Sequence, residues 1–289
     1  MAGIIEYSVV KGEKVRSVAE IASERDDLIR EQMYEIGLRN IPTHNERFLS
    51  DMIRQAYEML HQHPDCILIA HSLPFISKNG VPCLSVDSVP VFCLSGLPCA
   101  IMHKAIEIAC KMADAEIYKK ILVIGADKAY SDSERIFFGT IMGDAVVAVL
   151  IGKAAVSNKI LASEVSSTII APDGENSSPE EIQQFRSANA SMMRAAIQRC
   201  MQKSDIDHID HFVTHTSNRH FWNNMAVLMK IPRDIFMDDN IIHTGHMNSH
   251  DSFFHYFHFI ETGKIKEGEV SMLINPGFGG TQGCTLIKT

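Results

Sequence analysis

The chain has 289 residues, with 27 Lys and Arg against 35 Asp and Glu, so its formal charge is −8 at pH 7. This length corresponds to about two domains, or to one large domain with two halves, and it can bury a core without a disulfide or a metal. The 46% hydrophobic and 21% charged residues exclude a disordered chain. The acidic balance argues against a protein that binds nucleic acids or anionic membranes, because both need clustered Lys and Arg.

The cysteines and the N-terminus predict a cytoplasmic protein with reduced thiols. The seven cysteines form no CxxC pair, so neither a zinc ribbon nor a thioredoxin-type site is expected. The first residues show no basic segment followed by an apolar one, so no signal peptide is expected, and no apolar run reaches the 18 or so residues that cross a bilayer. One thiol is a candidate nucleophile, and we expect the others to be small core residues. The cysteines are Cys66, Cys83, Cys93, Cys99, Cys110, Cys200 and Cys284.

Short apolar segments alternate with helical patterns along the chain, which is typical of an α/β fold with a buried sheet. In chain order, strands are expected at residues 66–70, 89–93, 121–125, 145–151, 160–165, 212–214 and 270–274. Helices are expected at residues 46–61, 100–113, 179–202 and 252–262, because their apolar residues recur at three- and four-residue steps.

The two halves of the chain repeat one pattern. The first and third helices each lead to a strand that ends in a His and a hydroxyl residue, at His71 and at His215. Each half then closes with two strands bounded by glycines. This self-similarity predicts one duplicated α/β unit, with halves at 1–155 and 156–289, rather than two unrelated domains. The closing strand pairs are 120–125 with 143–150, and 270–274 with 283–287.

Cys99 is the first candidate for chemistry. An apolar strand runs into a turn with Gly96 and Pro98, and a long apolar helix begins at Cys99. At a helix N-terminus the macrodipole favours a thiolate over a thiol. Cys93 lies inside the preceding strand and Cys110 in the middle of the helix, so we expect both to be core residues. A structural role for Cys99 is the alternative at this stage.

His215 and the polar segment 242–252 supply candidate acid–base groups. His215 ends a strand, where open α/β sheets place their ligands, although a buried His can also be purely structural. In the segment, Asp251 could cap the following helix or present a carboxylate to a catalytic base. A metal site is a remote alternative, because the spacings of the local histidines match no zinc template. These histidines are His243, His246, His250, His255 and His258.

The glycine-rich segment 275–283 lies between the last two strands and contains Gly277, Gly279 and Gly280. It does not open a helix, so it does not predict a dinucleotide site. It can bring backbone N–H groups close to a reacting atom and form an oxyanion hole, or it can be a plain hairpin turn.

Taken together and in this order, these segments resemble the thiolase superfamily, and within it the 3-oxoacyl-acyl-carrier-protein synthase III-like (ketosynthase III-like) branch. The resemblance implies a thiolase fold, with duplicated βαβαβ halves that form a five-layered αβαβα sandwich. It also implies a cysteine that takes an acyl group from a thioester of coenzyme A or of a carrier protein, with no bound cofactor or metal. The segments that carry the resemblance are Cys99-Ala100 with its helix, 122–127, Gly143-Asp144-Ala145, 213–218, 263–268 and the glycine-rich C-terminus.

By this resemblance, Cys99 is the nucleophile and His215 the second catalytic residue. The third position departs from the decarboxylating members, which carry an Asn there. This chain has His246 at that position and Asn248 two residues later. The segment looks like that of relatives that acylate alcohols or amines in natural-product pathways, in which Asp251 would complete a Cys-His-Asp triad and orient His215. Backbone N–H groups of Cys99 and of the Gly277–Gly280 loop would hold the oxyanion, and Asn218, Arg219 and Asn248 would contact the substrate.

The departure from the decarboxylating members at His246 and Asp251 favours acyl transfer over Claisen condensation. Decarboxylation builds an enolate, which a nearby carboxylate repels, whereas transfer to a hydroxyl or an amine needs a base. We therefore expect a ping-pong acyltransferase that acts on acyl-CoA or an acyl carrier protein. The alternatives are a decarboxylating condensing enzyme and a catalytically silent partner subunit.

Two parts of the chain are short relative to the family, the N-terminal arm and the stretch between Leu73 and Pro90. In the family these parts help to form the dimer interface and the acyl tunnel. A homodimer, or a heterodimer with a homologue, and a long tunnel are therefore less strongly implied here.

Overall fold

The computed structural model describes residues 2–23, 27–44, 48–73, 84, 86, 88–137, 139–216 and 219–289. Within these residues ten strands pair in the order β12-β11-β13-β14-β10-β1-β9-β6-β4-β5. The first set comprises β1 (Gly3–Lys11), β4 (Cys66–Ala70), β5 (Val91–Leu94), β6 (Lys120–Asp127) and β9 (Ala145–Gly152). The second set comprises β10 (Lys159–Ser167), β11 (His211–Thr214), β12 (Phe236–Met237), β13 (Val270–Gly277) and β14 (Thr281–Lys288).

The two sets have the same topology. In each, the first and fourth strands run antiparallel to the last, and the second strand runs parallel to the third and the fourth. The predicted duplication is therefore present in the strand pairing. The sets join through the pairing of Gly3 with Lys159. The chain passes from one set to the other between Gly152 and Lys159, and we propose the boundary at 155/156 in this connection.

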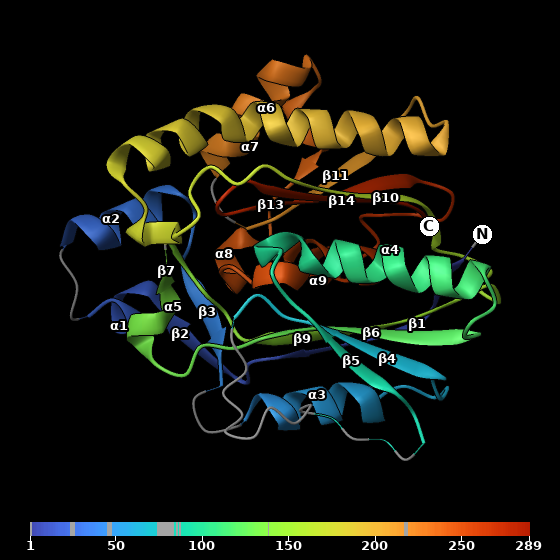
Figure 1. Ribbon diagram of the computed structural model, residues 1–289. Coiled ribbons are helices and arrows are strands. Elements are labelled where there is room, and N and C mark those ends of the chain that lie inside the picture. The colour runs from blue at the N-terminus through green and yellow to red at the C-terminus, as the bar shows by residue number, and fades with distance from the viewer. Residues whose placement is uncertain are drawn as a thin grey trace.

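The helices form three layers around the two sets of strands (Figure 1). Helices α4 (Ile101–Asp114) and α9 (Asp251–Glu261) lie between the two sets. Helices α6 (Pro179–Ser204) and α7 (Arg219–Met229) cover the outer face of the second set, and α3 (Leu49–Glu58) covers that of the first. The expected five-layered αβαβα sandwich is confirmed.

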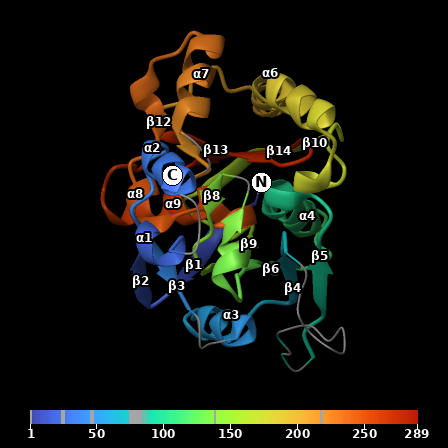
Figure 2. The same ribbon diagram turned by 90° about the vertical axis from the view of Figure 1, so that its left-hand side faces the viewer.

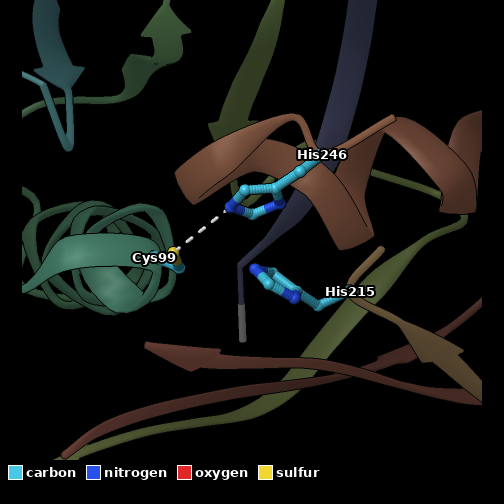
Figure 3. Close-up of side chains that lie close together, drawn as sticks. All are labelled: Cys99, His215 and His246. Carbon is cyan, nitrogen blue, oxygen red and sulfur yellow. Dashed lines mark hydrogen bonds between the residues drawn. The ribbon is translucent and has the colours of Figure 1, made fainter. Parts of the chain in front are cut away.

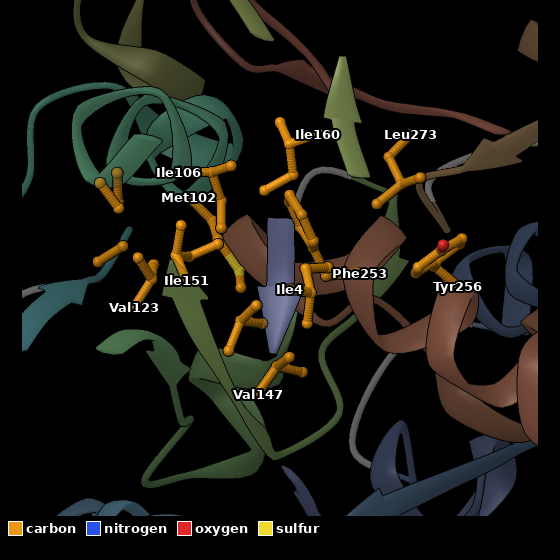
Figure 4. Close-up of a cluster of buried hydrophobic side chains, with 14 of the residues drawn as sticks. Ile4, Met102, Ile106, Val123, Val147, Ile151, Ile160, Phe253, Tyr256 and Leu273 are labelled. Carbon is orange, nitrogen blue, oxygen red and sulfur yellow. The ribbon is translucent and has the colours of Figure 1, made fainter. Parts of the chain in front are cut away.

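The middle layer contains the largest apolar core. Met102 of α4 and Phe253 of α9 pack there against Ile4 of β1, Ile160 of β10 and Leu273 of β13 (Figure 4). Separate clusters fix α6 and α7 to the second set of strands and α3 to the first. Because the central cluster takes side chains from both sets, it holds the two halves together. No helix in the described part of the chain is long and apolar enough to cross a membrane.

Shorter elements gather at the end of the sandwich that Figure 2 turns toward the viewer. Residues of α1, α2, β3 and α8 form their own apolar cluster there. These elements are β2 (Lys14–Ser17), α1 (Val18–Ile21), α2 (Asp27–Glu35), β3 (Asn40–Thr43), α5 (Asp132–Arg135), β7 (Ile136–Phe137), β8 (Thr140–Ile141) and α8 (Ile241–Thr244). Single 3₁₀ turns are η1 (Pro98–Ala100), η2 (Gly174–Asn176), η3 (Arg233–Ile235) and η4 (Asn248–His250).

All the strands and helices expected from the sequence are present, with ends that differ by a few residues. The prediction for Cys93 was wrong, because this residue is exposed. It lies on β5, which is an edge strand of the sheet. Asp144, in one of the segments that carry the resemblance, is buried and structural. It accepts two hydrogen bonds from the buried guanidinium of Arg135, at 2.6 and 2.7 Å.

Candidate active site

Cys99 lies where the first half of the chain meets the second. It is the second residue of η1, and α4 follows directly, so it has the expected place before a helix N-terminus. Gly96 has a φ of +88° and allows the tight approach from β5, and Pro98 starts the turn with its fixed φ. The Cys99 side chain is buried but lines a pocket of about 510 Å³.

His246 is the residue that contacts the thiol. Its Nε2 lies 3.6 Å from the Cys99 Sγ (Figure 3). The backbone of His246 is held by the first half, since its N–H donates to the carbonyl of Ile141 at 2.8 Å and its carbonyl accepts from the N–H of Gly143 at 3.0 Å. His246 and Cys99 are thus 147 residues apart in sequence but fixed to the same part of the fold.

Asp251 completes a chain of three side chains. Its Oδ2 lies 2.9 Å from His246 Nδ1 and accepts a hydrogen bond from the Thr216 N–H at 2.7 Å. Its Oδ1 accepts from the Thr216 hydroxyl at 2.8 Å and lies 2.9 Å from His255 Nε2. Both carboxylate oxygens are therefore engaged, and the geometry is that of a Cys99–His246–Asp251 triad.

The electrostatics of the triad follow from these contacts. Burial acts to raise the pKa of Asp251, but the hydrogen bonds with His246 and His255 hold it well below its ordinary value. Burial also acts against the charged form of His246. The hydrogen bonds to Asp251 and Cys99 outweigh it and raise the pKa of His246 to about 10. A protonated imidazole between the carboxylate and the sulfur is the favoured state.

His215 lies beside His246 but outside this chain of hydrogen bonds. The expectation that Asp251 orients His215 was wrong. Both carboxylate oxygens of Asp251 are bound by other residues, namely Thr216, His246 and His255. Neither ring nitrogen of His215 has a hydrogen-bond partner among the described residues. The centroids of the His215 and His246 rings are 4.2 Å apart. Burial and the neighbouring His246 lower the pKa of His215 well below its ordinary value, so this ring is neutral.

The glycines of the C-terminal loop divide into two groups. A side chain on Gly277 would come within 3.3 Å of the Cys99 backbone nitrogen, so Gly277 lies against the backbone of Cys99. Gly279 and Gly280 pack instead against the backbone after β10, and the Gly280 N–H donates to the Gly277 carbonyl. Because that N–H is used in the turn, the structure does not support an oxyanion role for Gly280. The N–H of Cys99, at the start of a helical turn, remains the candidate donor.

Asn275 is a site residue that the sequence reasoning missed. Its buried amide donates to the carbonyls of Cys99 and Ser249, both at 3.0 Å. It thereby ties η1, which carries the nucleophile, to η4, which lies between His246 and Asp251. The position of Asn275 as the first residue of the glycine-rich segment 275–283 was the available signal.

The predicted substrate contacts lie elsewhere. Asn248 is buried, and its amide donates to the Met142 sulfur rather than facing the pocket. Arg219 lies 3.5 Å from Asp238 and lines a separate depression, and Asn218 is outside the described residues. Besides His215 and His246, the pocket with Cys99 is lined by Arg186 and His220, which the sequence did not single out.

The histidines of residues 243–258 do not come together as a metal site. His246 faces Cys99, His255 faces Asp251, and His250 lies 3.9 Å from Asp127 on another strand end. His243 is exposed. The alternative of a metal centre built from these residues is therefore wrong.

Two family models match the chain, and together they cover more than half of it. The model described as 3-oxoacyl-[acyl-carrier-protein] synthase III matches residues 96–168, and the model of the C-terminal part of that enzyme matches residues 200–289. A curated relative, the beta-ketoacyl-[acyl-carrier-protein] synthase III of Mycobacteroides abscessus, is 26% identical over 243 residues. The match spans 74% of this chain and 71% of the relative.

Solved structures show the same fold. The 3-oxoacyl-[acyl-carrier-protein] synthase III of Aquifex aeolicus VF5 superposes with a TM-score of 0.79 at 18% identity, over 100% of both chains. ChlB3, described as an acyltransferase, superposes with a TM-score of 0.84 at 16% identity, over 100% of this chain and 97% of its own.

Proposed function

We propose that this chain, which belongs to the 3-oxoacyl-[acyl-carrier-protein] synthase III family of the thiolase superfamily, transfers an acyl group through a thioester on Cys99 to a hydroxyl or amine acceptor. The observation that carries the proposal is the Cys99–His246–Asp251 triad, in which a His stands where decarboxylating members carry an Asn. The donor would be acyl-CoA or an acyl carrier protein. A cytoplasmic location and a homodimer, or a heterodimer with a homologue, belong to the same proposal.

In the first half-reaction Cys99 becomes acylated. Nε2 of His246, 3.6 Å from Sγ, holds the proton that Cys99 gives up, and the thiolate sulfur attacks the thioester carbonyl. The backbone N–H of Cys99 stabilises the oxyanion, with Gly277 leaving room for it. Collapse of the tetrahedral intermediate breaks the bond to the donor sulfur, which takes the proton from His246. The buried Asp251 stabilises the imidazolium of His246 until that proton is given up.

In the second half-reaction the acceptor attacks the Cys99 thioester. The ring nitrogens of the neutral His215, which have no hydrogen-bond partner among the described residues, can accept the proton of the acceptor hydroxyl or amine. The new ester or amide bond forms as the bond to Sγ breaks. Cys99 leaves as a thiolate, and the proton on His215 returns to it or to solvent.

The buried carboxylate favours this reaction over decarboxylative condensation. Asp251 is ionised, and only the imidazole of His246 separates it from the Cys99 sulfur. The negative charge of the carboxylate would therefore repel an enolate that forms beside Cys99. Two imidazole rings beside the sulfur could still stabilise an enolate oxygen, which makes condensation the second candidate. A silent partner subunit is the third, and self-acylation distinguishes it from both enzymes.

The test is mass spectrometry of the protein after incubation with acyl-CoA, followed by a panel of small alcohols and amines. We expect a single acyl adduct on Cys99 that is lost to the acceptor, absence of the adduct in Cys99→Ala, and its persistence in Cys93→Ser, which removes an exposed thiol away from the site. Release of carbon dioxide from a malonyl thioester without transfer to the panel would support condensation instead. An adduct that persists in Cys99→Ala, or no adduct on the unaltered protein, would contradict the proposal.

A further inference from the structure

Three side chains with metal-binding atoms converge at the nucleophile. The Sγ of Cys99 and one ring nitrogen each of His215 and His246 lie within 4.8 Å of one another, and all three residues are buried. In Figure 3 the two rings lie beside the sulfur and come from different segments of the second half. Among the described residues this is the one group of three such ligands.

One of the three separations matches that around a tetrahedral zinc ion. With Zn–S near 2.3 Å and Zn–N near 2.0–2.1 Å, a tetrahedral angle separates the sulfur from the nitrogen by about 3.6 Å. The Cys99 Sγ and His246 Nε2 are 3.6 Å apart. A ring nitrogen of His215 lies within 4.8 Å of both of these atoms, so a shift of that ring toward the pair would supply a third ligand.

The surroundings of the three ligands are also those of a metal site. Asp251 binds His246 Nδ1 at 2.9 Å, an arrangement that fixes the ring and presents Nε2 to a metal. His215 is buried to 97%, with both ring nitrogens unpartnered within the described part of the chain, so it has a lone pair to offer. The pocket of about 510 Å³ opens onto the same point and leaves a fourth position for water.

We propose that Cys99, His215 and His246 bind a thiophilic divalent cation of the Zn²⁺ class, and that this binding reversibly blocks acylation of Cys99. The ion takes the thiolate and two neutral imidazoles, so binding releases the one proton that Cys99 and His246 share. Metal and acyl group exclude each other because both bond to Sγ. Coordination itself needs no acyl transfer, so it can be measured whether or not the proposed reaction is correct.

The test uses Co²⁺ as a spectroscopic substitute for Zn²⁺ with the full-length protein. We expect one equivalent of Co²⁺ to give a thiolate-to-metal charge-transfer band and tetrahedral d–d bands, which one equivalent of Zn²⁺ abolishes. Zn²⁺ should also protect Cys99 from iodoacetamide, as read by peptide mass spectrometry, and a chelator should restore alkylation. Cys93→Ser should bind as the unaltered protein does.

Variants of the ligands separate this site from adventitious binding. Cys99→Ser should lose the charge-transfer band, and His215→Ala should bind Co²⁺ at least about 10-fold more weakly. Asp251→Asn, which alters a group behind a ligand, should weaken binding by about 10- to 100-fold. Unchanged affinity in a folded His215→Ala, or saturation with Zn²⁺ that leaves Cys99 fully reactive in the unaltered protein, would overturn the proposal. The reactivity of Cys99 at saturating Zn²⁺ is measured on the unaltered protein. This measurement therefore tests the proposal even if His215→Ala does not fold.

Discussion

The carboxylate of Asp251 lies 2.9 Å from Nδ1 of His246, and both side chains are buried. The buried carboxylate thus supports the ring that contacts the thiol rather than the ring of His215. This relationship assigns different tasks to the two histidines, and the tasks can be tested separately.

Asp251→Asn should slow acylation of Cys99 by roughly 10²- to 10⁴-fold at pH 7, because a neutral amide neither stabilises the His246 imidazolium nor fixes its tautomer. The rate is measured by quenched-flow mass spectrometry with acyl-CoA. Asp239→Asn, at an exposed carboxylate paired with Lys264, serves as the control and should acylate normally. Equal rates in the two variants would show that Asp251 is only structural.

His215→Ala should separate the two half-reactions. We expect acylation of Cys99 within about threefold of the unaltered rate, because His215 does not contact Asp251. Deacylation should fall by roughly 10²- to 10⁴-fold, the usual contribution of a general base. Water is the simplest hydroxyl acceptor, so hydrolysis of the preloaded acyl-enzyme is the measurement, with the exposed His208→Ala as control. A variant slowed equally in both steps would contradict this division of tasks.

His255 is expected to be a positioning residue. It lies one helical turn after Asp251, binds its Oδ1 at 2.9 Å and has the Asn240 amide at 3.1 Å from its other ring nitrogen. It also contacts the Thr216 hydroxyl. His255→Phe removes a hydrogen bond from a buried carboxylate and should slow acylation by about 10-fold. His255→Gln can restore a hydrogen-bond donor to Asp251 and should recover most of the acylation rate. If His255 only filled space, Phe would replace it better than Gln.

The stability of the protein should fall steeply in acid. Burial lowers the pKa of His103 to about 3, against an ordinary value of 6.5. Below pH 6.5, His103 therefore binds a proton in the unfolded chain but stays unprotonated in the folded chain. The stability associated with this group is fully present above pH 6.5 and is lost as the pH falls toward 3, by up to about 1.4 kcal/mol per pH unit.

Urea titrations at pH 7, 6 and 5 measure this loss. His103→Gln can keep a hydrogen bond to Thr285, which His103 Nδ1 contacts at 2.8 Å, but it cannot titrate. We expect its free energy of unfolding to decline less between pH 6 and pH 5 than that of the unaltered protein. Parallel declines would mean that His103 is protonated in the fold.

Much of the fold could be predicted because its strands are apolar over their whole length. The strands β4, β6 and β9 are buried almost throughout, and such runs are visible in a sequence. Strand β1 was missed because polar residues interrupt it. Ser8 is buried with its hydroxyl donating to the Ala56 carbonyl at 2.6 Å, and Glu6 accepts from the His61 N–H at 2.8 Å. These partners are distant in sequence and cannot be read from the strand itself.

The candidate site shows a similar limit. The ends of predicted strands and helices indicated Cys99, His215 and Asp251 as candidates, and the family resemblance added His246. It could not say which His faces the carboxylate, because that depends on side-chain direction and on competition from Thr216, whose N–H and hydroxyl both bind Asp251. Arg219 was misplaced for the same reason, as its guanidinium turns to Asp238.

The Asn275 amide joins the Cys99 carbonyl, 176 residues away, to the turn that separates His246 from Asp251. Contacts over such separations form late in folding, after the loops between them have closed. A nascent or partly folded chain therefore carries an ordinary, unassisted thiol, and the reactive cysteine exists only once the two halves have docked. Labelling of Cys99 by an acyl thioester would then mark the completion of folding, and a protein lacking either half would be chemically silent at this position.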